Sequence, residues 1–265
     1  MIIAITNQKG GVGKTTSVIN IGTYIALGGS KVLLVDIDPQ SNLTSGLGFS
    51  QNENGSIYSF LTGDSELSET VLKTRVNNLD IIPASIELAG AEVELVNTLS
   101  RETILKRGLE KVYKDYDYIL IDCPPSLGLL TVNGLVSADR VLIPVQAEYF
   151  ALEGLGQLVN TIRLIKSNLN IELDIGGVII TMFDGRTNLS KDVGKEIEEF
   201  FKDRMFKTMI PRNVKLSEAP SRGLTIHEYA PSSVGAVSYR LLAQEIIEKF
   251  GSAPALKRPG LHKKD

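Results

Sequence analysis

Short, nearly uninterrupted runs of apolar residues recur along the chain, and such runs are typical of buried β-strands. The first of them, at residues 2–6, is rich in branched side chains and ends in a glycine-rich turn. Half-exposed strands alternate between apolar and polar residues, so runs without that alternation indicate a sheet covered on both faces. The runs predict strands at residues 2–6, 31–36, 79–83, 118–122, 140–145 and 177–182.

Stretches with apolar residues at helical spacing lie between these runs. They predict helices at residues 15–27, 86–99, 103–112, 151–165, 191–201 and 236–250. Strands that alternate with helices indicate an α/β fold, in which a mostly parallel, twisted sheet is flanked by helices on both faces. The serines, glycines and asparagines at residues 41–56 are interpreted as a loop and a short helix. We therefore expect a single domain at residues 1–250.

Composition limits the kind of protein that this chain can be. Residues 251–265 contain Pro254, Pro259 and Gly260 among basic side chains, which predicts a disordered tail. The net charge of −3 excludes binding to nucleic acid by bulk charge, so any DNA contact must come from a local basic patch. The single cysteine, Cys123, excludes an internal disulfide and fits a reducing cytoplasm. No signal peptide or apolar run of about 18 residues is present, so we expect a soluble cytoplasmic protein.

The turn after the first predicted strand carries a phosphate-binding motif. Gly13, Lys14 and Thr15 end it as in the P-loop pattern Gly-x-x-x-x-Gly-Lys-Ser/Thr, whose main-chain N–H groups surround phosphate oxygens. Lys14 is expected to contact the β- and γ-phosphates and Thr15 to bind Mg²⁺, next to the positive end of a helix dipole. The first glycine position holds Gln8 instead, and an additional lysine, Lys9, enters the loop. The motif predicts a site for ATP and Mg²⁺.

Acidic residues end two other predicted strands. Asp36 and Asp38 follow the strand at 31–36, and Asp122 ends the strand at 118–122. An apolar strand that ends in aspartate is the Walker B pattern, which holds Mg²⁺ directly or through a water molecule. Carboxyl ends of parallel strands meet at one edge of a sheet, so these acids are expected near the nucleotide. Helix N-capping stays open as the alternative role for Asp36 and Asp38.

The residues Lys-Gly-Gly-x-Gly-Lys-Thr-Thr at 9–16 resemble the deviant Walker A motif of the ParA/MinD family of ATPases. Residues 145–154 and 210–221 are similar to the chromosomal ParA/Soj branch in particular. The resemblance implies that Lys9 crosses a dimer interface to the partner's nucleotide, as an arginine finger does. It also implies that Asp38 orients the attacking water and that Asp36 supports the loop and the metal shell. A carboxylate positions water better than it deprotonates it, so we expect hydrolysis to be slow. The nucleotide contacts that the resemblance implies are Lys9, Gly10, Gly11, Val12, Gly13, Lys14, Thr15 and Thr16, with Pro211 and Asn213 beside the adenine.

The same resemblance implies a switch that serves chromosome or plasmid partitioning. ATP binding would form a homodimer that binds DNA non-specifically, and hydrolysis, stimulated by a ParB/Spo0J-like centromere-binding protein, would release it. The DNA contacts would include Arg186 and Lys215, with Arg222 as an addition, although each of these residues taken alone is an ordinary surface cation. We expect the ATP-bound form to be associated with the nucleoid.

Other members of the wider class remain to be weighed. A MinD-like ATPase at the membrane surface is the nearest alternative, but residues 253–260 are interrupted by prolines and have little apolar surface for an amphipathic helix. An iron–sulfur relative is excluded because Cys123 supplies only one thiolate per subunit. A bacterial tyrosine kinase would carry a terminal tyrosine cluster, and the last 25 residues contain no tyrosine. A ligase-like metabolic enzyme stays open.

Overall fold

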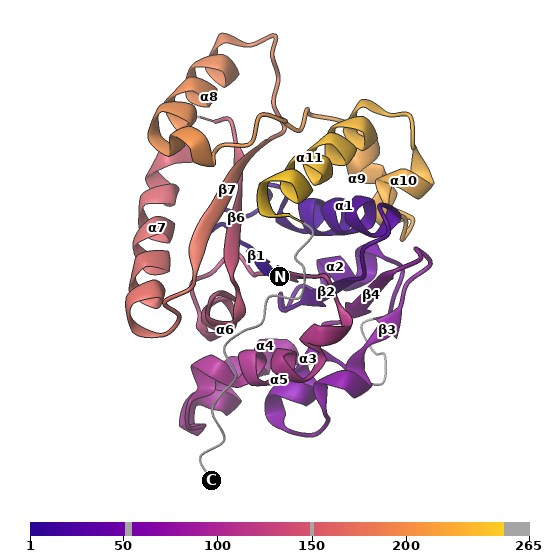
Figure 1. The fold of residues 1–265 in the computed structure, drawn as a ribbon, viewed down its shortest axis with the longest axis vertical. Helices are drawn as coiled ribbons and strands as arrows, with labels where there is room; N and C mark the ends of the chain where they lie inside the picture. Colours follow the sequence, from indigo (N-terminus) through magenta and orange to yellow (C-terminus); the bar gives the residue numbers. More distant parts are fainter. Residues whose placement is uncertain (51–54, 149–150, 252–265) are drawn as a thin grey trace.

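One mostly parallel sheet forms the centre of the molecule (Figure 1). The computed structural model describes residues 1–50, 55–148 and 151–251. In these residues, seven strands follow the order β3-β4-β2-β5-β1-β6-β7, and all neighbours are parallel except β3 and β4. The strands are β1 (Ile2–Ile5), β2 (Val32–Asp36), β3 (Leu72–Lys73), β4 (Leu79–Ile82), β5 (Tyr118–Asp122), β6 (Arg140–Gln146) and β7 (Asp174–Thr181). The predicted α/β fold is confirmed, with a short antiparallel edge strand that the sequence did not predict.

Helices cover both faces of this sheet (Figure 1). The α-helices are α1 (Lys14–Leu27), α2 (Asn42–Gly46), α3 (Ile57–Thr62), α4 (Leu88–Glu94), α5 (Ile104–Val112), α6 (Leu129–Ser137), α7 (Ala151–Asn168), α8 (Asn188–Phe201), α9 (Val214–Ser221), α10 (Ile226–Tyr229) and α11 (Val234–Phe250). Short 3₁₀ helices are η1 (Leu67–Thr70), η2 (Leu95–Asn97), η3 (Arg101–Thr103), η4 (Tyr113–Asp115) and η5 (Lys202–Arg204). The single helix predicted at 86–99 is wrong in its extent, because α4 tightens into η2 after Glu94.

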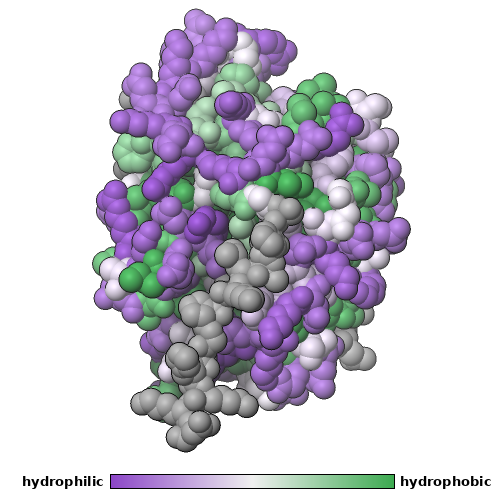
Figure 2. Space-filling model, viewed as in Figure 1, coloured by the Kyte–Doolittle hydropathy of each residue, from purple (hydrophilic) through white to green (hydrophobic). Residues whose placement is uncertain are grey.

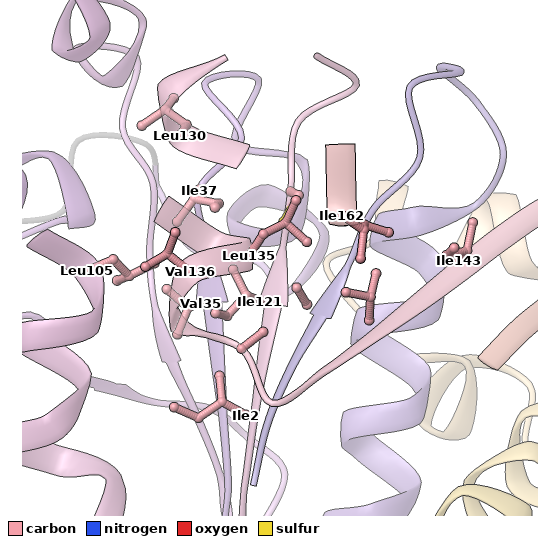
Figure 3. Packing of buried hydrophobic residues seen from close by; sticks show 14 of the residues in the cluster. Ile2, Val35, Ile37, Leu105, Ile121, Leu130, Leu135, Val136, Ile143 and Ile162 are labelled. Atoms are coloured by element: carbon pink, nitrogen blue, oxygen red, sulfur yellow. The ribbon is translucent and has the colours of Figure 1, made fainter. Parts of the chain in front are cut away.

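Alternate residues of each central strand enter two separate hydrophobic cores. In β1, Ile2 belongs to the core under α4–α8, whereas Ile3 belongs to the core under α1 and α11. Val35 and Ile121 from β2 and β5 share the first core (Figure 3). Side chains alternate between the faces of a strand, so only strands that are apolar at every position can fill both cores. This explains why the central strands lack an alternating pattern.

Helix α1 approaches the sheet unusually closely because a glycine faces it. A Cβ atom at Gly22 would lie 2.6 Å from Cδ2 of Leu34 on β2. The helix that follows the predicted phosphate loop is therefore held directly against the strands that carry the acidic residues.

The surface bears on the membrane alternative. Figure 2 shows hydrophilic residues spread over the viewed face, with hydrophobic residues exposed between them. Within the described residues, no helix is both long and apolar enough to cross a membrane. The predicted tail at 251–265 lies outside the described residues, apart from Gly251.

Candidate nucleotide and metal site

The carboxyl ends of β2, β5 and β1 bring the predicted site together. These strands are adjacent, and Asp122 is paired in register with both Asp36 and Ile5. The P-loop continues from β1, so it begins beside the two acids. Adjacent parallel strands whose loops diverge at one edge of a sheet are the usual location of nucleotide sites.

Two glycines allow the P-loop to turn back onto the start of α1. Gly11 and Gly13 have φ angles of 73° and 86°, in the left-handed region that side chains other than glycine rarely adopt. Gly13 is also the N-cap of α1. Between them Val12 is buried, and its carbonyl accepts a 2.8 Å hydrogen bond from Oγ1 of Thr181 at the end of β7. The loop is thus fixed to a strand far from it in sequence.

Lys14 is a largely buried cation inside this loop. The whole residue is 7% exposed, and Nζ donates a 3.3 Å hydrogen bond to the carbonyl of Lys9. Burial lowers the pKa of Lys14, while the carboxylates of Asp122 and Asp38 oppose that effect. The ammonium group therefore lies among the acids that the sequence placed near the phosphates.

Asp122 has the surroundings expected of a metal ligand. It is fully buried, and within the described residues neither carboxylate oxygen accepts a hydrogen bond of ordinary geometry. Burial and then the charge of Asp36 raise the pKa of Asp122, whereas the nearby Thr15 side chain lowers it. A buried carboxylate without partners is costly unless a cation joins it. Asp122 and Thr15 offer the oxygen ligands that Mg²⁺ prefers, so these residues fit the metal.

The other two acids hold their own loop. Asp36 accepts hydrogen bonds from the hydroxyl and the N–H of Thr44 at 2.7 and 2.9 Å, and from the N–H of Asp38 at 3.1 Å. Burial raises the pKa of Asp36 to about 7, although the bonds from Thr44 oppose this. Asp38 is buried, and its Oδ1 accepts a 3.0 Å bond from the N–H of Gln40. Both acids lie beside Asp122.

No set of three or more His, Cys, Asp or Glu side chains in the described ranges is arranged to hold a metal by itself. Mg²⁺ is commonly held by one or two protein ligands together with substrate phosphates and water.

Lys9 lies at the exposed side of the loop. Its Nζ forms a 2.7 Å ion pair with Oε2 of Glu148, just beyond β6, and both side chains are about half exposed. Asn7 Oδ1 accepts a 3.0 Å hydrogen bond from the main-chain N–H of Lys9. Sequence reasoning missed the roles of Asn7, Glu148 and Thr181, because each acts across more than 130 positions, as the separations of 137, 139 and 169 show.

The residues assigned to adenine follow β7. Pro211 pairs with Phe183, which lies just after that strand. Asn213 is the N-cap of α9, and its Oδ1 accepts a 2.9 Å hydrogen bond from the N–H of Lys215. The side chain of Asn213 therefore has a structural partner, and a contact with adenine stays a prediction.

Two of the three residues assigned to DNA form ion pairs within the chain. Arg186 donates to both oxygens of Asp184, through Nε at 2.9 Å and Nη2 at 2.7 Å. Lys215 Nζ lies 2.8 Å from Oε2 of Glu218. Arg222 is exposed at the end of α9. Any DNA contact through the first two must compete with these acids.

A P-loop between β1 and α1, with acids at the neighbouring strand ends, defines the protein as a P-loop nucleotide hydrolase. Residues 1–175 match the family described as an AAA domain. The chain is 57% identical over 246 residues to the sporulation initiation inhibitor protein Soj of Bacillus subtilis, which covers 92% of this chain and 97% of that protein. It is 53% identical over 249 residues to the chromosome-partitioning ATPase Soj of Treponema pallidum, covering 94% and 98%.

Solved structures share the fold and the cofactors. Cobyrinic acid a,c-diamide synthase from Mycobacterium smegmatis, with bound ATP analog and magnesium, has a TM-score of 0.83 at 38% identity and covers 94% of this chain and 95% of that one. The septum site-determining protein MinD from Pyrococcus horikoshii, complexed with Mg-ADP, has a TM-score of 0.76 at 26% identity, covering 96% and 98%. The chain belongs to the Soj/ParA family of chromosome-partitioning ATPases. It is an ATP-hydrolysing enzyme that uses ATP and Mg²⁺.

Proposed function

We propose that the protein is an ATP-dependent dimerising switch of the ParA/Soj type that serves chromosome or plasmid partitioning. Its ATP-bound homodimer binds DNA non-specifically, and hydrolysis, stimulated by a ParB-like partner, releases the DNA. The protein acts in the cytoplasm and is associated with the nucleoid while ATP is bound. The similarity to Soj proteins over more than nine-tenths of the chain supports this assignment.

The open space around Gly10 is the main structural support for the proposed dimer. A Cβ atom at Gly10 would meet no atom within 4 Å, and unlike Gly11 this residue is not left-handed. Nothing in the described part of a single chain therefore requires a glycine there. Next to it, the Lys9 side chain forms an ion pair with Glu148, and its main-chain carbonyl accepts a hydrogen bond from Lys14 Nζ. A second P-loop facing this one would account for both residues, through close contact at Gly10 and a new partner for Lys9.

The residues of one chain then divide the catalytic work. Lys14 and the main-chain N–H groups of the P-loop bind the phosphates, and Asp38 orients water for attack. Thr15 and Asp122 hold Mg²⁺, which neutralises charge on the phosphate oxygens when bound. Lys9 from the partner subunit adds a cation to the developing charge only in the closed dimer, so turnover depends on dimerisation.

Three variants test the switch by sedimentation velocity with and without ATP. Asp38→Ala should bind ATP but not hydrolyse it, so the dimer should accumulate. Gly10→Val should bind ATP yet stay monomeric, and Lys9→Ala should form no stable dimer. ATP-dependent dimers of normal stability in both P-loop variants, or wild-type hydrolysis by Asp38→Ala, would contradict the proposal.

DNA binding should be weak in one subunit and strong in the dimer. The chain has a net charge of −3, and Arg186 and Lys215 are paired with acids, so two of the assigned contacts are already engaged within one subunit. Joining two weak sites raises the effective concentration of the second and increases affinity by roughly 10²–10⁴-fold. Each cation that contacts a phosphate steepens the slope of log affinity against log salt by about 0.9.

Gel shifts on unrelated duplexes at several salt concentrations test this step. The double variant Arg186→Ala/Lys215→Ala should bind all sequences more weakly, with a flatter salt slope, and should still dimerise with ATP. Tight binding without ATP would contradict the switch. Co-sedimentation with liposomes is the parallel measurement, and ATP-dependent binding to liposomes in place of DNA would indicate the MinD-like alternative. Thin-layer analysis shows whether phosphate passes to water, as proposed, or to a small molecule, as in a ligase.

A further inference from the structure

Asn7 is a buried amide between β1 and the P-loop, and both of its polar ends are bonded. It is 5% exposed. Its Nδ2 donates a 2.7 Å hydrogen bond to the carbonyl of Pro144 on β6, and its Oδ1 accepts the 3.0 Å bond from the N–H of Lys9. An amide has one donor end and one acceptor end, so only this orientation satisfies both partners. Neither aspartate nor leucine, which have similar size, could replace it in both bonds.

The hydrogen bond from Asn7 to Pro144 takes the place of a main-chain hydrogen bond that is missing between β1 and β6. Strand β1 ends at Ile5, and the last main-chain bond from this segment to β6 runs from Thr6 N–H to the carbonyl of Leu142 at 3.2 Å. Pro144 lies two residues further along β6 and has no N–H with which to continue the ladder. The side chain of Asn7 binds the Pro144 carbonyl instead, so the main chain can turn into the P-loop while it stays attached to β6.

The same side chain fixes the main chain of Lys9. An asparagine that accepts from the N–H two residues ahead forms an Asx-turn, which holds the intervening backbone in one conformation. On its other side, the Lys9 carbonyl accepts from Lys14 Nζ. The backbone of Lys9 is thus anchored at both its N–H and its carbonyl, whereas the half-exposed pair with Glu148 is the one bond of its side chain among residues 1–50, 55–148 and 151–251. A surface pair of this kind is weak and exchanges readily.

We propose that Asn7 is a positioning residue for Lys9. It anchors the Lys9 backbone to β6, so that the lysine side chain extends toward the partner's nucleotide from a fixed backbone position. The inference rests on the proposed crossing of Lys9 in the dimer. Without the anchor, the loop at Lys9 samples more conformations, and dimer formation must order it again. Asn7 itself touches neither nucleotide nor metal in this role, and ATP affinity should depend on it little.

A double-mutant cycle between Asn7 and Lys9 tests the proposal. The measured quantity is the dissociation constant of the ATP-bound dimer, determined by sedimentation in the Asp38→Ala background so that ATP is not consumed. Asn7→Ala should weaken the dimer by about tenfold, which corresponds to the cost of ordering about one backbone residue when the dimer forms. In the Lys9→Ala background, where the dimer is no longer stable and its dissociation constant is followed at high protein concentration, the same change should have almost no further effect, because residues that act through one another are not additive. Fluorescent-nucleotide titration should give an ATP affinity close to that of the unsubstituted chain.

Asn20→Ala is the matched control. Asn20 is also a buried amide with two bonds, from Nδ2 to the Thr16 carbonyl at 2.8 Å and from the Ile226 N–H to Oδ1 at 3.0 Å, but it does not touch Lys9. Its effect on the dimer, whatever its size, should be the same with and without Lys9. Trypsin cleavage after Lys9 gives a readout without dimerisation, and it should be faster in Asn7→Ala but not in Asn20→Ala.

Asn7→Ser keeps a hydroxyl that can accept from the Lys9 N–H but loses the amide donor to Pro144, without burying a charge, and it serves in the cycle if Asn7→Ala does not fold. Equal losses from Asn7→Ala with and without Lys9, or no loss at all, would overturn the inference while the proposed function stands. If Lys9→Ala alone left dimer and turnover unchanged, both the proposed function and the inference would fail.

Discussion

Replacing Asp122 with asparagine should make the nucleotide-free protein more stable at about pH 8, although it removes a predicted metal ligand. The carboxylate is fully buried, and neither of its oxygens is hydrogen-bonded within the described residues. Burial and the neighbouring Asp36 raise its pKa, and the nearby Thr15 side chain and then Lys14 compensate only in part. Folding therefore moves a hydrated carboxylate into a site that disfavours its charge. Asparagine has nearly the same shape and carries no charge.

The stability gained by Asp122→Asn should increase as the pH rises. An aspartate has a pKa near 3.9 in an unfolded chain, and that of Asp122 is higher in the folded one. The folded state then holds more protons between the two values, so stability falls as pH rises, by about 1.4 kcal/mol per pH unit for each retained proton. For Asp36 this window extends from 3.8 to about 7. Asp122→Asn should therefore gain almost nothing near pH 4 and then about 1.4 kcal/mol per pH unit, until the pH passes the folded-state pKa of Asp122.

Urea unfolding of the wild type and the variant, with EDTA and without nucleotide, measures this difference at about pH 5, 6, 7 and 8. Groups that titrate equally in both proteins cancel in the difference. Asp115→Asn, at an exposed position, is the control and should give a flat line. With Mg²⁺ and ATP the order should reverse, because ligand that binds only the folded state stabilises the wild type more. A difference that does not change with pH, or a variant less stable at high pH, would refute the reasoning.

Three further changes have outcomes that follow from single contacts. Glu148→Gln removes the half-exposed partner of Lys9, and such pairs are worth about 0–1 kcal/mol. The ATP-bound dimer should therefore tighten by up to about fivefold in sedimentation, and a weaker dimer would contradict the idea that Glu148 competes with the partner's nucleotide for Lys9. Glu218→Gln frees Lys215, so gel shifts of the dimer should show tighter DNA binding and a slope steeper by up to about 0.9 per subunit, and an unchanged slope would argue against this lysine as a contact. Gly22→Ala places a Cβ atom 2.6 Å from a side chain of β2, which should lower the unfolding free energy by about 1–3 kcal/mol in urea while ATP affinity persists; an unaffected midpoint would mean that α1 moves freely.

The strands of this protein were predictable because a sheet covered on both faces needs apolar residues at every position. Strand β5 is buried along its whole length, and its terminal Asp122 could be recognised by the contrast with the residues before it. Helix α6 was not predicted, since Leu129–Ser137 contains threonine, valine, asparagine, glycine and serine, which are poor helix formers. It is helical because packing against the first core outweighs propensity. Strand β3 has only two residues and pairs with β4 across a turn, too short for any pattern.

The residues of the candidate site likewise fall into those that the sequence could predict and those that it could not. Residues within the P-loop and at strand ends could be named from sequence, because their chemistry is local to a motif. Asn7, Glu148 and Thr181 could not, because their partners come from strands that only the sheet order brings beside the loop. Arg186 and Asp184 are two residues apart in one turn, so a pair between them is possible from the sequence alone. The sequence could not predict that the pair forms, because no pattern distinguishes a paired arginine from a free one.

The balance of charge in the site gives the proposed switch its order of events. One chain gathers Asp36, Asp38 and Asp122 at the ends of β2 and β5, and only Lys14 opposes them from within the loop. Phosphates add negative charge, so Lys14 alone cannot hold them beside these acids, and metal and nucleotide should bind together. Charges in a water-poor site interact more strongly than in solution, so the negative charge that remains favours one more cation. Lys9 of the same chain is anchored by its backbone and paired with Glu148, whereas in the proposed dimer Lys9 of the second copy would approach from the open side of Gly10. Hydrolysis and phosphate release remove the charge that this lysine binds, so turnover should return Lys9 to Glu148 and separate the subunits.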